Sequence, residues 1–276
     1  MCDEVMVSDG GSSDGTWEAL ETLAAVEPRV DLVRDPWPPG RDFASTIRLA
    51  SERQRRRCRG EWCFYLQANE ILHEATTAEL QSLPARFPAA DMFRLPFLSL
   101  LGRRQAFHLE FRRRLVRNRP YIQVRGDGFD LGYAPLALLM RSPTRFLRYV
   151  AHRRGEMPVY LSRPVFRYRA LCPQNYLRKT VARAEWLGAS PTAASWRREA
   201  AIAESVAQGF SARDHRPEDY WRALRTELVA EGLWPSASTG APPADVDEQP
   251  AVLAELPERW EYRLEDSLGA WRGEPA

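Results

Sequence analysis

The spacing of apolar residues changes several times along this chain. Each stretch of constant spacing predicts one helix or strand. Short apolar runs at residues 3–7, 30–33 and 62–66 predict strands. Between them, apolar residues recur every three or four positions at residues 16–26 and 43–58, which predicts two helices. Strands that alternate with helices in this way predict an α/β fold.

The middle of the chain is richer in strands. Residues 92–100 predict one strand, and residues 107–124 predict two strands around a turn at residues 118–120. Residues 71–83 predict a loop and a helix, which Pro84 ends because proline lacks the amide that a helix needs.

The carboxy-terminal third predicts helices and then a linker. Apolar residues recur at helical spacing in residues 174–187, 193–210 and 218–231, whereas residues 235–250 are rich in Pro, Ala, Ser, Gly and Asp. We therefore expect three parts, which are residues 1–170, a helical part at residues 171–234, and a linker and tail at residues 235–276.

The turn after the first predicted strand carries the most chemical information. Residues 9–16 read Asp-Gly-Gly-Ser-Ser-Asp-Gly-Thr. Glycine permits backbone angles that other residues resist, and Ser, Asp and Thr side chains accept hydrogen bonds from free amides where a helix begins. This strand–turn–helix places the carboxylate of Asp9 at the carboxyl end of a strand, where ligands bind in open α/β sheets.

Two stretches resemble the family 2 glycosyltransferases. Residues 7–16, Val-Ser-Asp-Gly-Gly-Ser-Ser-Asp-Gly-Thr, are similar to the V-D-D-G-S-T-D-G-T turn of that family. Residues 60–70, Gly-Glu-Trp-Cys-Phe-Tyr-Leu-Gln-Ala-Asn-Glu, are similar to its G-E-W-V-L-F-L-D-A-D-E strand. Their order and spacing fit one intervening strand and helix, and the resemblance covers residues 1–75 with a weaker echo towards residue 190.

This resemblance implies a GT-A fold, which is a Rossmann-like mixed, mainly parallel sheet flanked by helices, here with a helical carboxy-terminal extension. It implies that a sugar moves with inversion from a nucleotide-sugar donor to a glycan or lipid-linked acceptor, as in bacterial polysaccharide biosynthesis. The implied location is the cytoplasm, at the inner face of the membrane. The alternative is a relative that keeps the fold as a non-catalytic binding or scaffold protein.

The resemblance also assigns roles to residues of both stretches. Asp9 is expected to contact the nucleotide base or ribose, and its turn is expected to shape the nucleotide site. Two amides, at the places of the family's two aspartates, are expected to face the diphosphate. The full set of expected nucleotide-binding residues is Asp9, Gly10, Gly11, Ser12, Asp14, Gln67 and Asn69.

A divalent cation, Mn²⁺ or Mg²⁺, is the cofactor that the resemblance implies, and such cations prefer carboxylate oxygens. Because amides replace the two aspartates here, the expected ligands are Asn69 and Glu70. One interpretation is a shifted site in which Glu74 or His73 assists Glu70. The other is that the metal site is lost and arginines neutralise the diphosphate.

Inverting members of the family need a carboxylate base that takes the proton from the acceptor hydroxyl. The segment Gly126-Asp127-Gly128-Phe129-Asp130 occupies the corresponding region, so Asp127 and Asp130 are the candidates. The competing interpretation is an ordinary glycine–aspartate turn.

The family's first strand and loop, of the type S-I-I-I-P-T-Y-N, has no counterpart in this sequence. The chain starts at what would be the second strand. Loss of a central strand leaves backbone groups unpaired, so we favour a start upstream of Met1 over a truncated, inactive protein.

The basic residues are almost all arginine, since Lys179 is the single lysine, but the formal net charge is only +2. Near-neutral charge and the absence of a recognisable binding motif argue against nucleic acid as a partner. Arginines are dense at residues 103–125, which predicts either a solvated β-hairpin with outward arginines or an anion site. Association with a membrane surface is a further alternative for the arginine- and tryptophan-containing segments.

Overall fold

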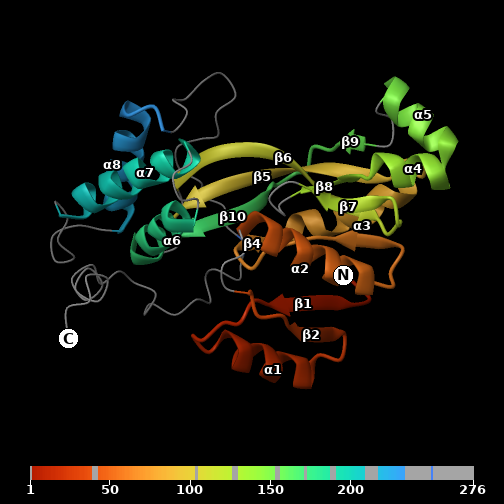
Figure 1. Ribbon diagram of the computed structural model, residues 1–276, viewed down its shortest axis with the longest axis horizontal. Coiled ribbons are helices and arrows are strands. Elements are labelled where there is room, and N and C mark those ends of the chain that lie inside the picture. Colours follow the sequence, from red (N-terminus) through yellow and green to blue (C-terminus); the bar gives the residue numbers. More distant parts are fainter. Residues whose placement is uncertain are drawn as a thin grey trace. The chain divides into compact units, whose positions relative to one another are not determined.

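The computed structural model describes residues 2–38, 43–102, 105–125, 130–152, 156–170, 173–186, 191–208, 217–233 and 250. They form a mixed α/β protein, as predicted (Figure 1). In chain order the elements are β1 (Val5–Asp9), α1 (Thr16–Val26), β2 (Val30–Arg34), α2 (Phe43–Arg57), β3 (Trp62–Phe64), β4 (Glu70–Ile71), a 3₁₀ turn (Glu74–Thr76), α3 (Thr77–Arg86), β5 (Met92–Leu101), β6 (Gln105–Arg117), β7 (Ile122–Arg125), β8 (Asp130–Tyr133), α4 (Pro135–Arg141), α5 (Pro143–His152), β9 (Glu156–Pro158), β10 (Val165–Ala170), α6 (Pro173–Trp186), α7 (Pro191–Gln208) and α8 (Pro217–Ala230).

The chain divides into two compact units. The first unit contains Met1–Leu66, Thr77–Leu95 and Phe111–Leu161, and the second contains Gln67–Thr76, Pro96–Glu110 and Ser162–Ala276. The predicted linker and tail lie almost wholly outside the described residues, so the three-part division at residues 170 and 234 stays a prediction.

In the first unit, β1, α1 and β2 form a parallel strand–helix–strand unit. β1 pairs with β2 in parallel, from Val5 opposite Val30 to Asp9 opposite Arg34. Helix α1 packs beside β2 (Figure 1), as a crossover between parallel strands requires. The predicted helix at residues 16–26 is therefore confirmed, and the predicted strand is shifted two residues so that it ends on Asp9.

Strands β1 and β3 each have one edge that pairs with no described strand. β1 pairs only with β2, and β3 pairs only with β6 among the strands that the structure describes. The amides of Arg59 and Gly60, just before β3, both donate to Glu4 Oε1, at 2.5 and 2.8 Å. One side chain thus joins the starts of the two strands. No apolar side chain within residues 2–38 is fully buried.

The larger sheet is mixed, so the mainly parallel sheet that we expected is not confirmed. Its strand order is β3-β6-β5-β10-β4, with β9 also paired to β5. The β5–β10 and β5–β9 pairs are parallel, but the β3–β6 and β10–β4 pairs are antiparallel. A separate antiparallel pair joins β7 to β8.

The expected hairpin at residues 107–124 is wrong in its pairing. Two strands do flank the turn at residues 118–120, but β7 pairs with β8 and lies outside the sheet that contains β6. Nor do all the arginines point outward. Arg114 is fully buried, and its guanidinium lies 4.7 Å from the centre of the Tyr65 ring, where it gains a cation–π interaction.

Three other predictions need correction. Helix α3 continues past Pro84 to Arg86, because the proline removes only its own amide, and the amide of Phe87 still donates to the carbonyl of Leu83 at 2.9 Å. Helices α4 and α5 were missed; each begins at a proline, in a segment dense in arginine and apolar residues. Prolines at the first helical position are well tolerated, and here they mark helix starts.

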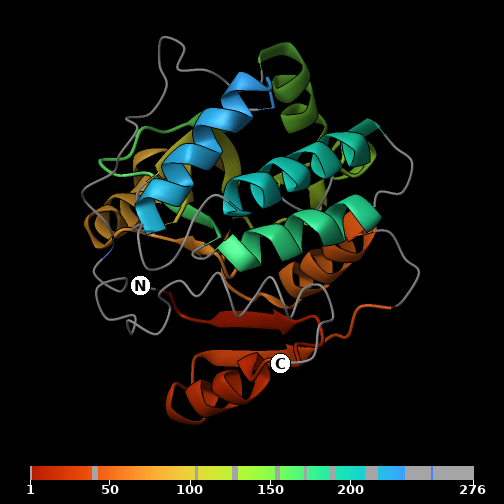
Figure 2. The same ribbon diagram turned by 90° about the vertical axis from the view of Figure 1, so that its left-hand side faces the viewer.

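Helices of the second unit enclose its own core. Helices α6 and α7 lie side by side, and α8 packs on α7 (Figure 2). Tyr176, Tyr220 and Trp221 are buried between them together with Leu224 and Leu228. Leu101 at the end of β5 joins this cluster, so the strand and the helices share one apolar core.

Candidate functional site

The turn after β1 is organised by Asp9. Its Oδ2 accepts hydrogen bonds from the amides of Gly11 and Ser12, both at 2.9 Å, and its Oδ1 accepts one from the Ser12 hydroxyl. Burial acts to raise the pKa of the Asp9 carboxyl, but the hydrogen bonds from Ser12 and Gly11 outweigh it, so the pKa lies below its usual value. Asp9 is therefore an ionised, buried carboxylate that fixes the shape of its own turn.

An aromatic side chain that sequence reasoning missed lies against this turn. The amide of Trp37 donates to the carbonyl of Gly10 at 3.0 Å, and the amide of Asp35 donates to the carbonyl of Asp9 at 2.8 Å. A Cβ atom at Gly10 would lie 2.6 Å from the Trp37 ring, so the ring would have to move to accommodate any other residue. Trp37 itself is 40% exposed. Its signal in the sequence was weak, because it stands in a proline-rich loop with no periodic pattern.

Asp14 has a different role from Asp9. Its Oδ1 accepts hydrogen bonds from the amide and the hydroxyl of Thr16, at 3.2 and 2.6 Å. These bonds, the hydroxyl bond foremost, lower the pKa of the exposed Asp14 carboxyl. Asp14 thus supports the start of α1, as the sequence predicted for this turn.

The corner from Gln67 to Glu70, in the second unit, contains a buried ion pair. The Glu70 carboxylate accepts a hydrogen bond from the main-chain amide of Gln67 at 2.9 Å. Arg167 is its partner across the β4–β10 pair, and Arg167 Nε lies 3.8 Å from Glu70 Oε1. A second carboxylate, Glu110, lies 3.5 Å from Arg167 Nη1. Arg167 therefore faces the single carboxylate of the corner.

Asn69 holds the same corner to β10. Its side-chain amide donates to the main-chain carbonyl of Tyr168 at 3.0 Å. The main-chain carbonyl of Asn69 in turn accepts a hydrogen bond from the main-chain amide of Tyr168 at 2.8 Å. Because Asn69 carries no charge and Glu70 already faces a guanidinium, these residues do not fit a divalent cation, which needs several oxygen ligands. No group of three or more His, Cys, Asp or Glu side chains that could hold a metal occurs among the described residues.

The two side chains proposed to assist Glu70 have local partners. His73 is buried, and its Nδ1 lies 3.1 Å from the amide of Ala75 and 3.4 Å from Glu74 Oε2. The His73 ring also contacts the Phe166 ring, with 6.1 Å between their centres. These contacts give His73 a structural role at the 3₁₀ turn.

Of the two candidate bases, the structure describes Asp130, whereas Asp127 lies outside the described residues. Asp130 Oδ1 accepts the amide of Arg113 at 2.9 Å, and Oδ2 lies 2.9 Å from Arg113 Nε and 2.6 Å from Nη2. Arg113 also lies 3.6 Å from Glu156. Both oxygens of Asp130 are thus engaged by Arg113.

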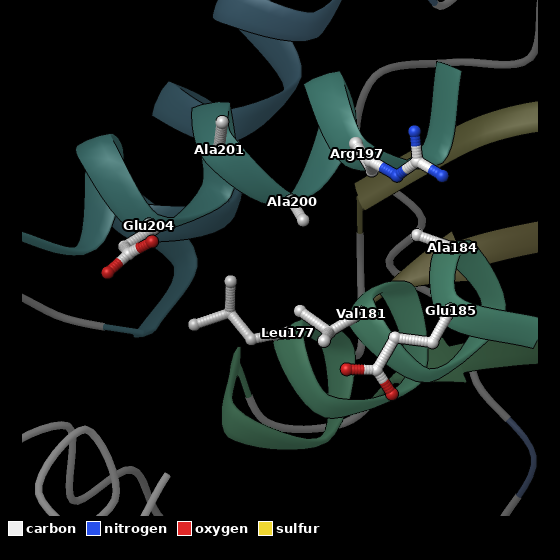
Figure 3. Close-up of a pocket in the computed structure, with 8 residues that line it drawn as sticks. All are labelled: Leu177, Val181, Ala184, Glu185, Arg197, Ala200, Ala201 and Glu204. Carbon is white, nitrogen blue, oxygen red and sulfur yellow. The ribbon is translucent and has the colours of Figure 1, made fainter. Parts of the chain in front are cut away.

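A hollow in the second unit lies apart from all these residues. It has a volume of about 270 Å³ and lies between α6 and α7, lined mainly by apolar side chains with Glu185, Arg197 and Glu204 at its rim (Figure 3). None of the predicted site residues lines it.

Comparison of the chain with protein-family models and with curated proteins gives no match.

Proposed function

We propose that the chain is a glycosyltransferase-like protein of the GT-A type, which binds a nucleotide-sugar donor at the turn after β1. The observation that carries the proposal is the parallel β1–α1–β2 unit with an ionised, buried carboxylate at the carboxyl end of its first strand. Ligands of open α/β sheets bind at such strand ends. The order β2-β1 together with the open edges of β1 and β3 also agrees with a GT-A sheet that lacks one strand.

Within this proposal, Asp9 acts through its turn. Its carboxylate orients the Gly10–Ser12 backbone, and Gly10 lets that backbone lie against the indole of Trp37. An exposed indole beside a glycine-rich turn can stack on a nucleobase, which is worth about 1–3 kcal/mol in other base-binding sites. The diphosphate would be neutralised by arginine, because the Gln67–Glu70 corner does not fit a metal ion. Asp127 and Asp130 stay the proposed bases for transfer to a glycan or lipid-linked acceptor.

Nucleotide binding is the direct test. We expect a uridine, guanosine, cytidine or thymidine diphosphate to raise the melting temperature of the protein, and Asp9→Asn to remove that increase by distorting the turn. Asp31→Asn is the matched control, since it removes one carboxylate from the neighbouring strand β2, where Asp31 is half-exposed and forms an ion pair with Arg57. If none of the nucleotides shifts the transition of the wild-type protein by scanning fluorimetry, the donor site is refuted.

A non-catalytic binding or scaffold protein is the second candidate. Two observations favour it, namely the engagement of both Asp130 oxygens by Arg113 and the unsuitable donor set at Asn69 and Glu70. Incubation with a radiolabelled nucleotide sugar distinguishes the two functions. Binding without any hydrolysis or transfer, in the presence of Mn²⁺ and in its absence, would favour the scaffold.

A further inference from the structure

Large apolar side chains are exposed in one segment of the first unit, on α4, on α5 and after β9. Leu136 and Met140 on α4 are 70% and 76% exposed, Leu147 on α5 is 62% exposed, and Tyr160 beyond β9 is 83% exposed. Single exposed apolar residues are ordinary, but a contiguous group marks a surface that contacts something other than water.

The apolar stripe of α4 faces outward. Leu136, Leu139 and Met140 stand at positions i, i+3 and i+4, which places them on one face of the helix. A helix of a globular protein usually turns such a stripe towards the core. Here Leu136 and Met140 are mostly exposed and Leu139 is 43% exposed, so much of the stripe faces solvent.

Helix α5 is held to the unit by its other face. Arg145 forms an ion pair with the buried Asp91 and also reaches the hydroxyl of Tyr121, at 3.2 Å. Phe146 packs on the apolar cluster that contains Tyr121 and Tyr133. These anchors fix which side of α5 faces inward and leave Leu147 outside, and α4 packs on α5 to form one helical hairpin (Figure 1).

The charge of this segment has a single sign. Residues 131–155 contain five arginines and neither aspartate nor glutamate, and the exposed Arg141 directly follows the apolar stripe of α4. The nearest acids on either side, Asp130 and Glu156, are both paired with Arg113. Apolar side chains next to arginines form the combination that binds the surface of an anionic bilayer, with the apolar groups at the acyl boundary and the cations at the headgroups.

We infer that the α4–α5 hairpin is a docking surface for membranes that contain anionic lipids. The protein lies on such a membrane without crossing it, since no helix in the described ranges is long and apolar enough to span a bilayer. This inference does not depend on the proposed transferase activity, because it rests on the exposure and charge of the hairpin alone.

Cosedimentation with vesicles tests the inference on the full chain. We expect wild-type protein to bind vesicles made of equal parts phosphatidylglycerol and phosphatidylcholine about tenfold more tightly than vesicles of phosphatidylcholine alone. The variant Leu136→Gln/Met140→Gln/Leu147→Gln should lose about tenfold in affinity for the anionic vesicles. Because these side chains are exposed already, its melting temperature should equal that of the wild type.

The matched control is Leu23→Gln/Val26→Gln on α1. Val26 is 76% exposed, as Met140 is, but it does not belong to the hairpin. This control should bind vesicles as the wild type does, and Arg141→Gln should weaken binding about fivefold. Absence of wild-type binding to the anionic vesicles would overturn the inference. So would equal loss in the α1 control, or a hairpin variant that binds vesicles normally but no longer self-associates in gel filtration.

Discussion

At the scale of single residues, side chains that a motif marks as ligands form hydrogen bonds that stabilise the backbone around them. Asp9 and Asp14 each accept hydrogen bonds from groups of their own turn, and Asn69 donates one to the carbonyl of Tyr168 on β10. A buried polar atom without such a partner is costly. The same side chain can still serve a ligand indirectly, because the geometry of the loop depends on it.

The charge of Asp9 gives a pH dependence with a defined sign. A carboxyl whose pKa is lowered on folding stabilises the protein at pH values above its pKa in the unfolded chain, which is near 3.8. This stabilisation is lost as the pH falls through the lower pKa of the folded state. We expect Asp9→Asn to lower the free energy of unfolding by about 1–3 kcal/mol at neutral pH. Urea titrations from pH 6 to about pH 2 should show the difference from wild type shrinking as the pH falls. A difference that stays constant over this range would contradict the assignment.

Gly102 is the residue whose replacement should harm the second unit most clearly. It has a φ of 56°, and a Cβ atom there would lie 2.4 Å from Cδ1 of the buried Trp221. We expect Gly102→Ala to cost about 2–4 kcal/mol, from backbone strain and overpacking together. Gly232→Ala is the control, since Gly232 has a φ of 65° but open space around it, and should cost about 1 kcal/mol. Equal losses in chemical denaturation would show that the contact with Trp221 is unimportant.

At the scale of elements, the regular crossover unit was predictable and the irregular middle of the chain was not. The helix α1 follows from apolar residues that recur every three or four positions, and the strand β5 follows from a continuous apolar run that is buried along almost its whole length. The pairing of β7 with β8 is local, from Arg125 opposite Asp130 to Ile122 opposite Tyr133, but the apolar period does not show with which neighbouring strand β7 pairs. The buried Arg114 was unpredictable because its environment comes from Tyr65 on a distant segment.

Within the candidate site, the contacts local to each motif were predicted and the contacts between distant segments were not. Asp9 and its glycines do form one turn, and Gln67, Asn69 and Glu70 do form one corner. Trp37 and the ion pair of Glu70 with Arg167 are tertiary contacts that no local pattern marks. The position of Arg167 opposite Glu70 follows only from the strand register.

The link between β1 and β3 through Glu4 can be tested as an element-level contact. The amide of Gly60, above all, lowers the pKa of the Glu4 carboxyl, and Arg59 assists. We expect Glu4→Ala to lower the free energy of unfolding by about 1–2 kcal/mol. It should also speed amide hydrogen exchange at the starts of β1 and β3. Glu21→Ala, on the exposed side of α1, is the control and should change neither.

At the scale of the whole molecule, the chain crosses between two compact units several times. Residues of β5 and of β6 are divided between the units, so neither unit is a continuous stretch of sequence. The carboxy-terminal helices add a core of their own, whereas the β1–α1–β2 unit buries almost no apolar side chain. The stabilisation that comes from apolar burial is therefore concentrated away from the proposed nucleotide-binding turn.

Among the described strands, β1 and β3 each have one side without a paired strand, and this has a practical consequence for handling the protein. A strand with unsatisfied amides and carbonyls acts as a template on which an extended segment of a neighbouring molecule can pair. Val5 and Val7 lie on such a strand without bulges, prolines or lysines that would discourage this pairing. Concentrated samples should therefore aggregate through added intermolecular strands. A lysine at Val7, on that strand, would be a direct way to keep the protein in solution.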